Sequence, residues 1–171
     1  IFIKTEKSYK SFLRFSDLSY ANIYLRSMKN IELKDLFGGN CYHICTNGQE
    51  TPTIIMDMED YRVATNYIAL AAWKTGIDIL VYIIMSNHIH ILVVCNDRSL
   101  ATKYIRLFKR LYSTHLLHKY NMSDALRGIE DSISLIDNVS YFRNCVAYIL
   151  RNALCAKICR RVEDYPWCSY Q

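Results

Sequence analysis

Two periods of hydrophobic and polar residues divide the chain into predicted strands and helices. Short apolar runs predict strands at Cys41 to Thr46, Ile77 to Met85, His88 to Val94 and Ser132 to Ile136. Segments with apolar residues every three or four positions predict helices from Asp57 to about Thr75, from Arg98 to about Tyr120, and from Asn138 or Ser140 to about Arg161. Strict βαβ alternation is missing, so the pattern predicts an α+β fold, an antiparallel sheet with helices packed on it.

The N-terminal part of the chain is predicted to be separate from this sheet. Residues 1–36 carry apolar residues at helical spacing and end before Gly38 and Gly39. We therefore expect an N-terminal helical appendage over residues 1–38 and a main domain over residues 39–171. The chain stops at Gln171, in an irregular segment that includes Tyr165-Pro166-Trp167, and we expect a further C-terminal part to follow it.

Composition excludes disorder and a membrane span. The 171 residues are 51% hydrophobic and 22% charged, which is enough apolar mass for a core. The longest apolar stretch, Ile77 to Cys95, is interrupted by polar residues before it reaches the roughly 18 residues that a span needs. The seven cysteines form no C-x-x-C pair, which argues against structural zinc and a disulfide framework. We expect reduced, mostly buried thiols and a cytoplasmic protein.

Charge is unevenly distributed along the chain. Residues 1–97 hold 9 Lys and Arg against 10 Asp and Glu, whereas residues 98–161 hold 12 against 4. A basic half beside a neutral half favours a polyanionic partner, with nucleic acid as the first candidate. An ordinary solvated basic surface is the alternative.

The sequence His88-Ile89-His90 is the sharpest local signal for chemistry. Side chains alternate along a strand, so both imidazoles point to one side while Ile89 points into the core. Their Cα atoms then lie about 6–7 Å apart, a spacing at which two histidines can converge on a divalent cation. The alternative is two half-buried histidines bonded to nearby backbone.

The last predicted helix offers groups that could complement this pair. Phe142, Val146, Ile149 and Ala153 form its apolar stripe, and Tyr148 and Asn152 lie one turn apart on the other side. A tyrosine and an amide on a polar face could supply a nucleophile and a metal ligand. With 14 tyrosines in the chain, a packing role for Tyr148 is the alternative.

Four motifs taken together resemble the single-tyrosine HUH transposases, in the branch of the REP-associated tyrosine transposases. They occur in the family's order over about residues 41–171, and are Tyr42-His43-Ile44, Met85-Ser86-Asn87-His88-Ile89-His90-Ile91-Leu92, Tyr148-Ile149-Leu150-Arg151-Asn152 and Glu163-Asp164-Tyr165-Pro166-Trp167-Cys168-Ser169-Tyr170.

The resemblance implies a transposase that cleaves single-stranded DNA and transfers the strand. His88, His90 and Asn152 would hold Mg²⁺ or Mn²⁺ at the scissile phosphate, and Tyr148 would be the nucleophile that forms a 5′-phosphotyrosine. Tyr112, which follows two basic residues, is the rival nucleophile. A metal-binding α+β domain with another hydrolytic role is a further alternative.

The resemblance also implies partners. Family members recognise DNA hairpins with adjacent single-stranded bases and form homodimers. Binding to DNA would draw on two basic clusters, namely Arg98, Lys103, Arg106, Lys109 and Arg110 in one and Lys157, Arg160 and Arg161 in the other. The alternative function is that of a domesticated protein that binds structured single-stranded DNA without transposition activity.

Overall fold

The predicted α+β fold is confirmed. A computed structural model describes residues 40–46 and 52–170, so the expected appendage and its Gly38-Gly39 boundary lie outside the described residues. The elements in chain order are β1 (Cys41–Thr46), α4 (Met58–Thr75), β2 (Asp78–Ile84), β3 (Ile89–Val94), α5 (Arg98–Tyr120), β4 (Asp131–Leu135), α6 (Val139–Cys155) and the short 3-10 helix η1 (Val162–Asp164). No helix of this part of the chain is long and apolar enough to cross a membrane.

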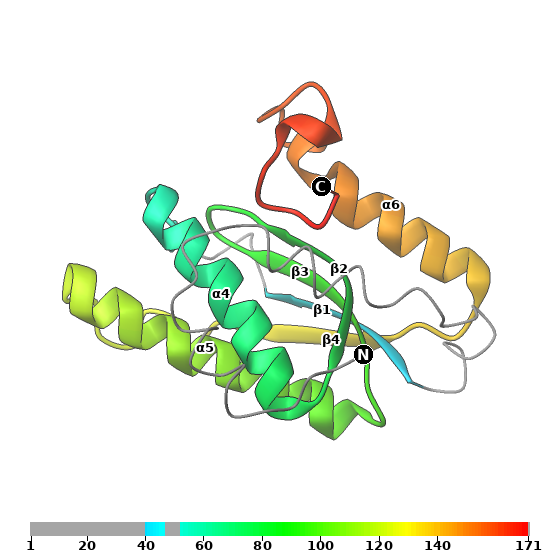
Figure 1. Cartoon of the computed structure of the whole chain (residues 1–171), viewed down its shortest axis with the longest axis horizontal. Helices are drawn as coiled ribbons and strands as arrows, with labels where there is room; N and C mark the ends of the chain where they lie inside the picture. The colour runs from blue at the N-terminus through cyan, green and yellow to red at the C-terminus, as the bar shows by residue number, and fades with distance from the viewer. Residues whose placement is uncertain (1–39, 47–51, 171) are drawn as a thin grey trace, which may run out of the picture.

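The sheet separates two layers of helices. Its order is β2-β3-β1-β4 with antiparallel pairing, and the consecutive strands β2 and β3 form a hairpin. Helices α4 and α5 pack together on one face, and α6 crosses the other face over β2 and β3 (Figure 1). Successive residues of β3 therefore face different helices, with Ile89 and Ile91 in the core. All seven cysteines are free thiols and four of them are buried.

Helix α6 ends six residues before the predicted end at Arg161. Lys157 adopts a left-handed conformation with φ of 57°. The backbone N–H of Ile158 donates to the carbonyl of Ala153, and that of Lys157 to the carbonyl of Leu154. These two backbone hydrogen bonds form a Schellman motif, which ends a helix. The prediction was wrong because glycine or asparagine normally marks that position, and here a lysine occupies it.

The segment after α6 returns to the sheet and covers the free edge of β2. Ile83 pairs with Cys168, and the backbone N–H of Ile84 donates to the carbonyl of Trp167. The Tyr165 hydroxyl donates to the Ile84 carbonyl at 2.6 Å. An exposed sheet edge is a template for unwanted pairing, so this cover protects it. It also ties the end of α6 to the strand next to β3.

A buried carboxylate joins α4 to α5. Asp60 has no solvent exposure and accepts hydrogen bonds from His115, Lys119 and Tyr120 at 2.8–2.9 Å. It also caps α4 together with Asp57. Burial acts to raise the pKa of Asp60, but these hydrogen bonds outweigh it and bring the pKa to about 2. The network therefore keeps a charge inside the fold.

We expect Asp60→Asn to lower the free energy of unfolding by about 2 kcal/mol at neutral pH. The carboxyl has a pKa near 3.8 when unfolded and about 2 when folded, so its stabilisation is present above pH 4 and disappears as the pH falls toward 2. Urea denaturation at several pH values measures the difference, which should shrink below pH 4. Asp124→Asn, at an exposed carboxylate, is the matched control and should change stability by less than about 0.5 kcal/mol. An equally stable Asp60→Asn protein would contradict the expectation.

Candidate active site

The turn between β2 and β3 presents the first histidine. The backbone N–H of Met85 donates to the His88 carbonyl at 2.8 Å, which closes a turn over Ser86 and Asn87. His88 Nδ1 lies 2.7 Å from Asn87 Oδ1. The rings of His88 and His90 have centroids 5.0 Å apart and stand nearly perpendicular. The two imidazoles thus share one face of the strand, as the alternation predicts.

A third imidazole, His43 of β1, belongs to the same cluster. Its Nε2 lies 3.2 Å from Nδ1 of His90, and the two rings stack with centroids 5.3 Å apart. No role was predicted for this residue from the sequence. Its position on a predicted strand was visible, but its neighbour was not, because the pairing of β1 with β3 joins segments about 47 residues apart.

Helix α6 brings Tyr148 and Asn152 over the histidines. The Tyr148 ring lies 5.2 Å from that of His90 and 6.4 Å from that of His43, edge-on to both. Tyr148 is 56% exposed, so its hydroxyl is open to a substrate. Asn152, one turn later, hydrogen-bonds to His88. Four residues selected for the site therefore lie together in one chain, beside His43.

The histidines of the cluster are held uncharged. Burial lowers the pKa of His43 and of His88, and the hydrogen bond that His88 makes with Asn152 opposes this shift at His88. At His90, which is 5% exposed, burial and then the neighbouring His43 and His88 lower the pKa to about 3. Neutral imidazoles keep a free lone pair at neutral pH, which is the form that binds metal ions.

The donor set fits a divalent cation that takes additional ligands from its substrate. Within residues 40–46 and 52–170, no three His, Cys, Asp or Glu side chains form a group able to hold a metal by themselves. If two imidazoles and the Asn152 amide oxygen held such an ion, they would leave coordination positions for phosphate oxygens or water. Mixed nitrogen and oxygen ligands suit Mn²⁺, and Mg²⁺ accepts the oxygen donors.

The structure places the rival tyrosine in the core. Tyr112 of α5 is fully buried, and its hydroxyl donates to the Ile54 carbonyl at 2.9 Å. Burial raises its pKa well above the ordinary tyrosine range, which disfavours the phenolate. It also lies on the side of the sheet that α4 and α5 cover (Figure 1).

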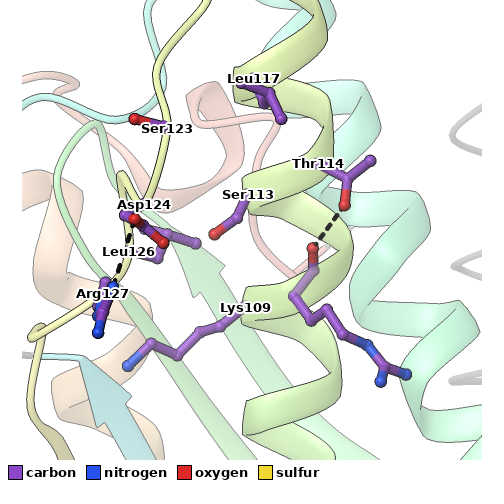
Figure 2. Close-up of a pocket in the computed structure, with 9 residues that line it drawn as sticks. Lys109, Ser113, Thr114, Leu117, Ser123, Asp124, Leu126 and Arg127 are labelled. Carbon is purple, nitrogen blue, oxygen red and sulfur yellow. Dashed lines mark hydrogen bonds and ion pairs between the residues drawn. The ribbon is translucent and has the colours of Figure 1, made fainter.

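The basic residues selected for DNA binding fall on two surfaces. Lys157, Arg160 and Arg161 are exposed in the segment just after α6, which lies on the α6 side of the sheet (Figure 1). The other cluster lies on α5, across the sheet, where Lys109 bonds to Asp131 at 3.1 Å. Beside that helix an open groove of about 420 Å³ runs between α5 and residues 123–127. Figure 2 shows the side chains of Lys109, Ser113 and Arg127 around it.

Two solved structures are similar to the chain, and the one with a TM-score above 0.5 supports the fold. The chain is similar to "Structure of the REP associates tyrosine transposase bound to a REP hairpin", with a TM-score of 0.58, 15% identity and 77% of each chain covered. A putative transposase from Deinococcus radiodurans R1 matches with a TM-score of 0.45 and 12% identity, over 66% of this chain and 88% of that one. No curated protein matches the chain.

The family model described as "Transposase IS200 like" matches residues 40–129. This range begins at β1 and contains His43, His88 and His90; it ends before α6 and Tyr148. The matched range covers more than half of the chain, and the members of this family are DNA-processing enzymes. The chain therefore belongs to the family of IS200-like transposases, in agreement with the resemblance that its four motifs together carry.

Proposed function

We propose that this protein cleaves single-stranded DNA through Tyr148 and transfers the strand, using a divalent metal ion held by His88, His90 and Asn152. The observation that carries the proposal is the position of Tyr148. Its exposed ring lies 5.2 Å from the buried ring of His90 in the same chain. An exposed tyrosine beside neutral imidazoles, in a family of transposases, is suited to act on a bound phosphodiester.

The chain's own residues define the covalent step. The Tyr148 oxygen attacks phosphorus, the bond from phosphorus to the 3′ oxygen breaks, and that oxygen leaves with a proton as a 3′ hydroxyl. The phenolic proton is lost to solvent, since Tyr148 is open to it. The 5′ phosphate stays on the tyrosine as a diester. A later attack by a 3′ hydroxyl releases the tyrosine, so rejoining requires no nucleotide triphosphate.

His88, His90 and Asn152 would hold Mg²⁺ or Mn²⁺. When bound, such an ion acts as a Lewis acid on the scissile phosphate and orients it. The hydrogen bond to Asn87 fixes the ring of His88. Helix α6 brings Asn152 to His88, on the side of the histidines where Tyr148 also lies. Because Tyr148 and Asn152 lie on one helix, their spacing to the histidines is set by the way α6 packs on β3.

The proposed partners are a DNA hairpin with adjacent single-stranded bases and a second copy of the chain. The solved transposase with the same fold is bound to a REP hairpin. The eight basic residues named above supply phosphate contacts on both sides of the sheet. Among the described residues, nothing pairs with the outer edge of β4, which leaves that edge open to a second copy.

We expect each basic surface to contribute to DNA binding. Replacing Arg160 and Arg161, or Arg106 and Arg110, with glutamine should weaken binding and reduce the slope of log K against log salt by about 0.7–0.9 per lost phosphate contact. Fluorescence anisotropy with a labelled hairpin over a salt series measures this. Arg62→Gln, at an exposed arginine of α4, is the control. An unchanged slope for either pair would show that this surface makes no contact with DNA phosphates.

Covalent capture tests the proposed reaction. Protein is mixed with labelled single-stranded hairpin DNA from the flanks of its own gene, with Mn²⁺ or with EDTA, and resolved on a denaturing gel. The expected result is a slow band that needs Mn²⁺ and disappears with protease. Binding on a native gel without this band would overturn the cleavage proposal and favour a domesticated DNA-binding protein.

A further inference from the structure

His43 contacts a proposed metal ligand without being one of the proposed ligands. In the sheet, His43 pairs with Leu92 and Cys45 pairs with His90, so His43 and His90 are diagonal neighbours on one face. Their rings stack at an interplanar angle of 21°, and the short contact joins His43 Nε2 to His90 Nδ1 at 3.2 Å. One proton must lie between these two nitrogens for the contact to be a hydrogen bond.

The neighbouring histidine shows what such a contact does. Asn87 Oδ1 can only accept, so His88 Nδ1 carries the proton of their 2.7 Å bond. A neutral imidazole holds one proton, so Nε2 of His88 is the ring nitrogen that carries the lone pair. His90 is held through the same atom, Nδ1, by a different residue on a different strand.

We propose that His43 is a positioning residue that accepts the Nδ1 proton of His90 and so leaves Nε2 of His90 free to bind the metal ion. The inference rests on the proposed metal-dependent function. Partners of this kind fix the tautomer and the ring orientation of metal-binding histidines, and their loss costs about 10–100-fold in metal affinity. His43 itself lies farther from Tyr148 than His90 does, by ring centroids of 6.4 Å against 5.2 Å.

Two variants separate this role from simple packing. His43→Gln has a side-chain oxygen that can accept the proton, whereas His43→Phe keeps an aromatic ring at this position and has no nitrogen to accept it. Long-range proton–nitrogen NMR of the metal-free, ¹⁵N-labelled protein reports which ring nitrogen of His90 is protonated. We expect the Nδ1–H form in the wild type and in His43→Gln, and the Nε2–H form in His43→Phe. His90→Asn assigns the signals.

Calorimetry with Mn²⁺ and no DNA supplies the second readout. We expect His43→Phe to bind Mn²⁺ about 10–100-fold more weakly than the wild type, and His43→Gln to stay within about threefold. The Nε2–H form in the wild type, or unchanged Mn²⁺ affinity in His43→Phe, would overturn the inference. If the wild type shows the Nδ1–H form but binds no Mn²⁺, the proposed metal function fails while the contact between the two rings is supported.

Discussion

Tyr148→Phe should abolish the covalent protein–DNA product while leaving the fold and DNA binding unchanged. The substitution removes only the hydroxyl that forms the bond to phosphorus, and no other group at the site can replace it, so we expect a loss of at least about 1000-fold. Tyr148 is 56% exposed, so the change should alter stability by less than about 0.5 kcal/mol. The measurement is the rate of adduct formation on a denaturing gel, beside thermal unfolding and hairpin binding.

Tyr141→Phe is the matched control for this experiment. Tyr141 lies about two turns earlier on α6 and is 40% exposed. Among the described residues, the tyrosine of α6 whose ring contacts the histidines is Tyr148. The control should form adduct within about twofold of the wild type. Adduct of normal yield from Tyr148→Phe would place the nucleophile elsewhere. The buried position of Tyr112 shows that this rival could act only if α5 moved.

Much of the fold could be predicted from local sequence. β1 and α5 match their predicted ranges, and Asp57 caps the start of α4 as expected, because alternation and helix capping are short-range properties. The end of α6 could not be predicted in this way. A lysine in a left-handed conformation stops the helix, and that conformation is stabilised by backbone bonds that the sequence does not display.

Spacing in the sequence could group only those site residues that lie on the same strand or the same helix. His88 and His90 share a strand, and Tyr148 and Asn152 share a helix, so spacing alone placed each pair on one face. That the two pairs meet came from the family resemblance, because packing of α6 on β3 is a tertiary property. His43 was missed for the same reason, since its partner is set by the register of β1 against β3.

His88→Ala should make DNA cleavage depend on high metal concentration rather than abolish it. The change removes one proposed ligand and leaves His90 and Asn152, so metal affinity falls and excess Mn²⁺ partly restores the ion to the site. We expect at least a 100-fold slower cleavage at low Mn²⁺ and a partial recovery at high Mn²⁺. His88 is half-buried at the end of a turn, so its removal leaves the buried core of β3 in place.

The response to metal distinguishes the two halves of the proposed site. A lost ligand is compensated by mass action, whereas a lost nucleophile is not, so Tyr148→Phe should stay inactive at every Mn²⁺ concentration. His118→Ala, at an exposed histidine in the last turn of α5, controls for adventitious metal binding and should match the wild type. Cleavage by His88→Ala at the wild-type rate and the wild-type Mn²⁺ requirement would show that His88 is not a ligand. The two variants together thus test separately whether the histidine strand holds the metal and whether the helix above it supplies the nucleophile.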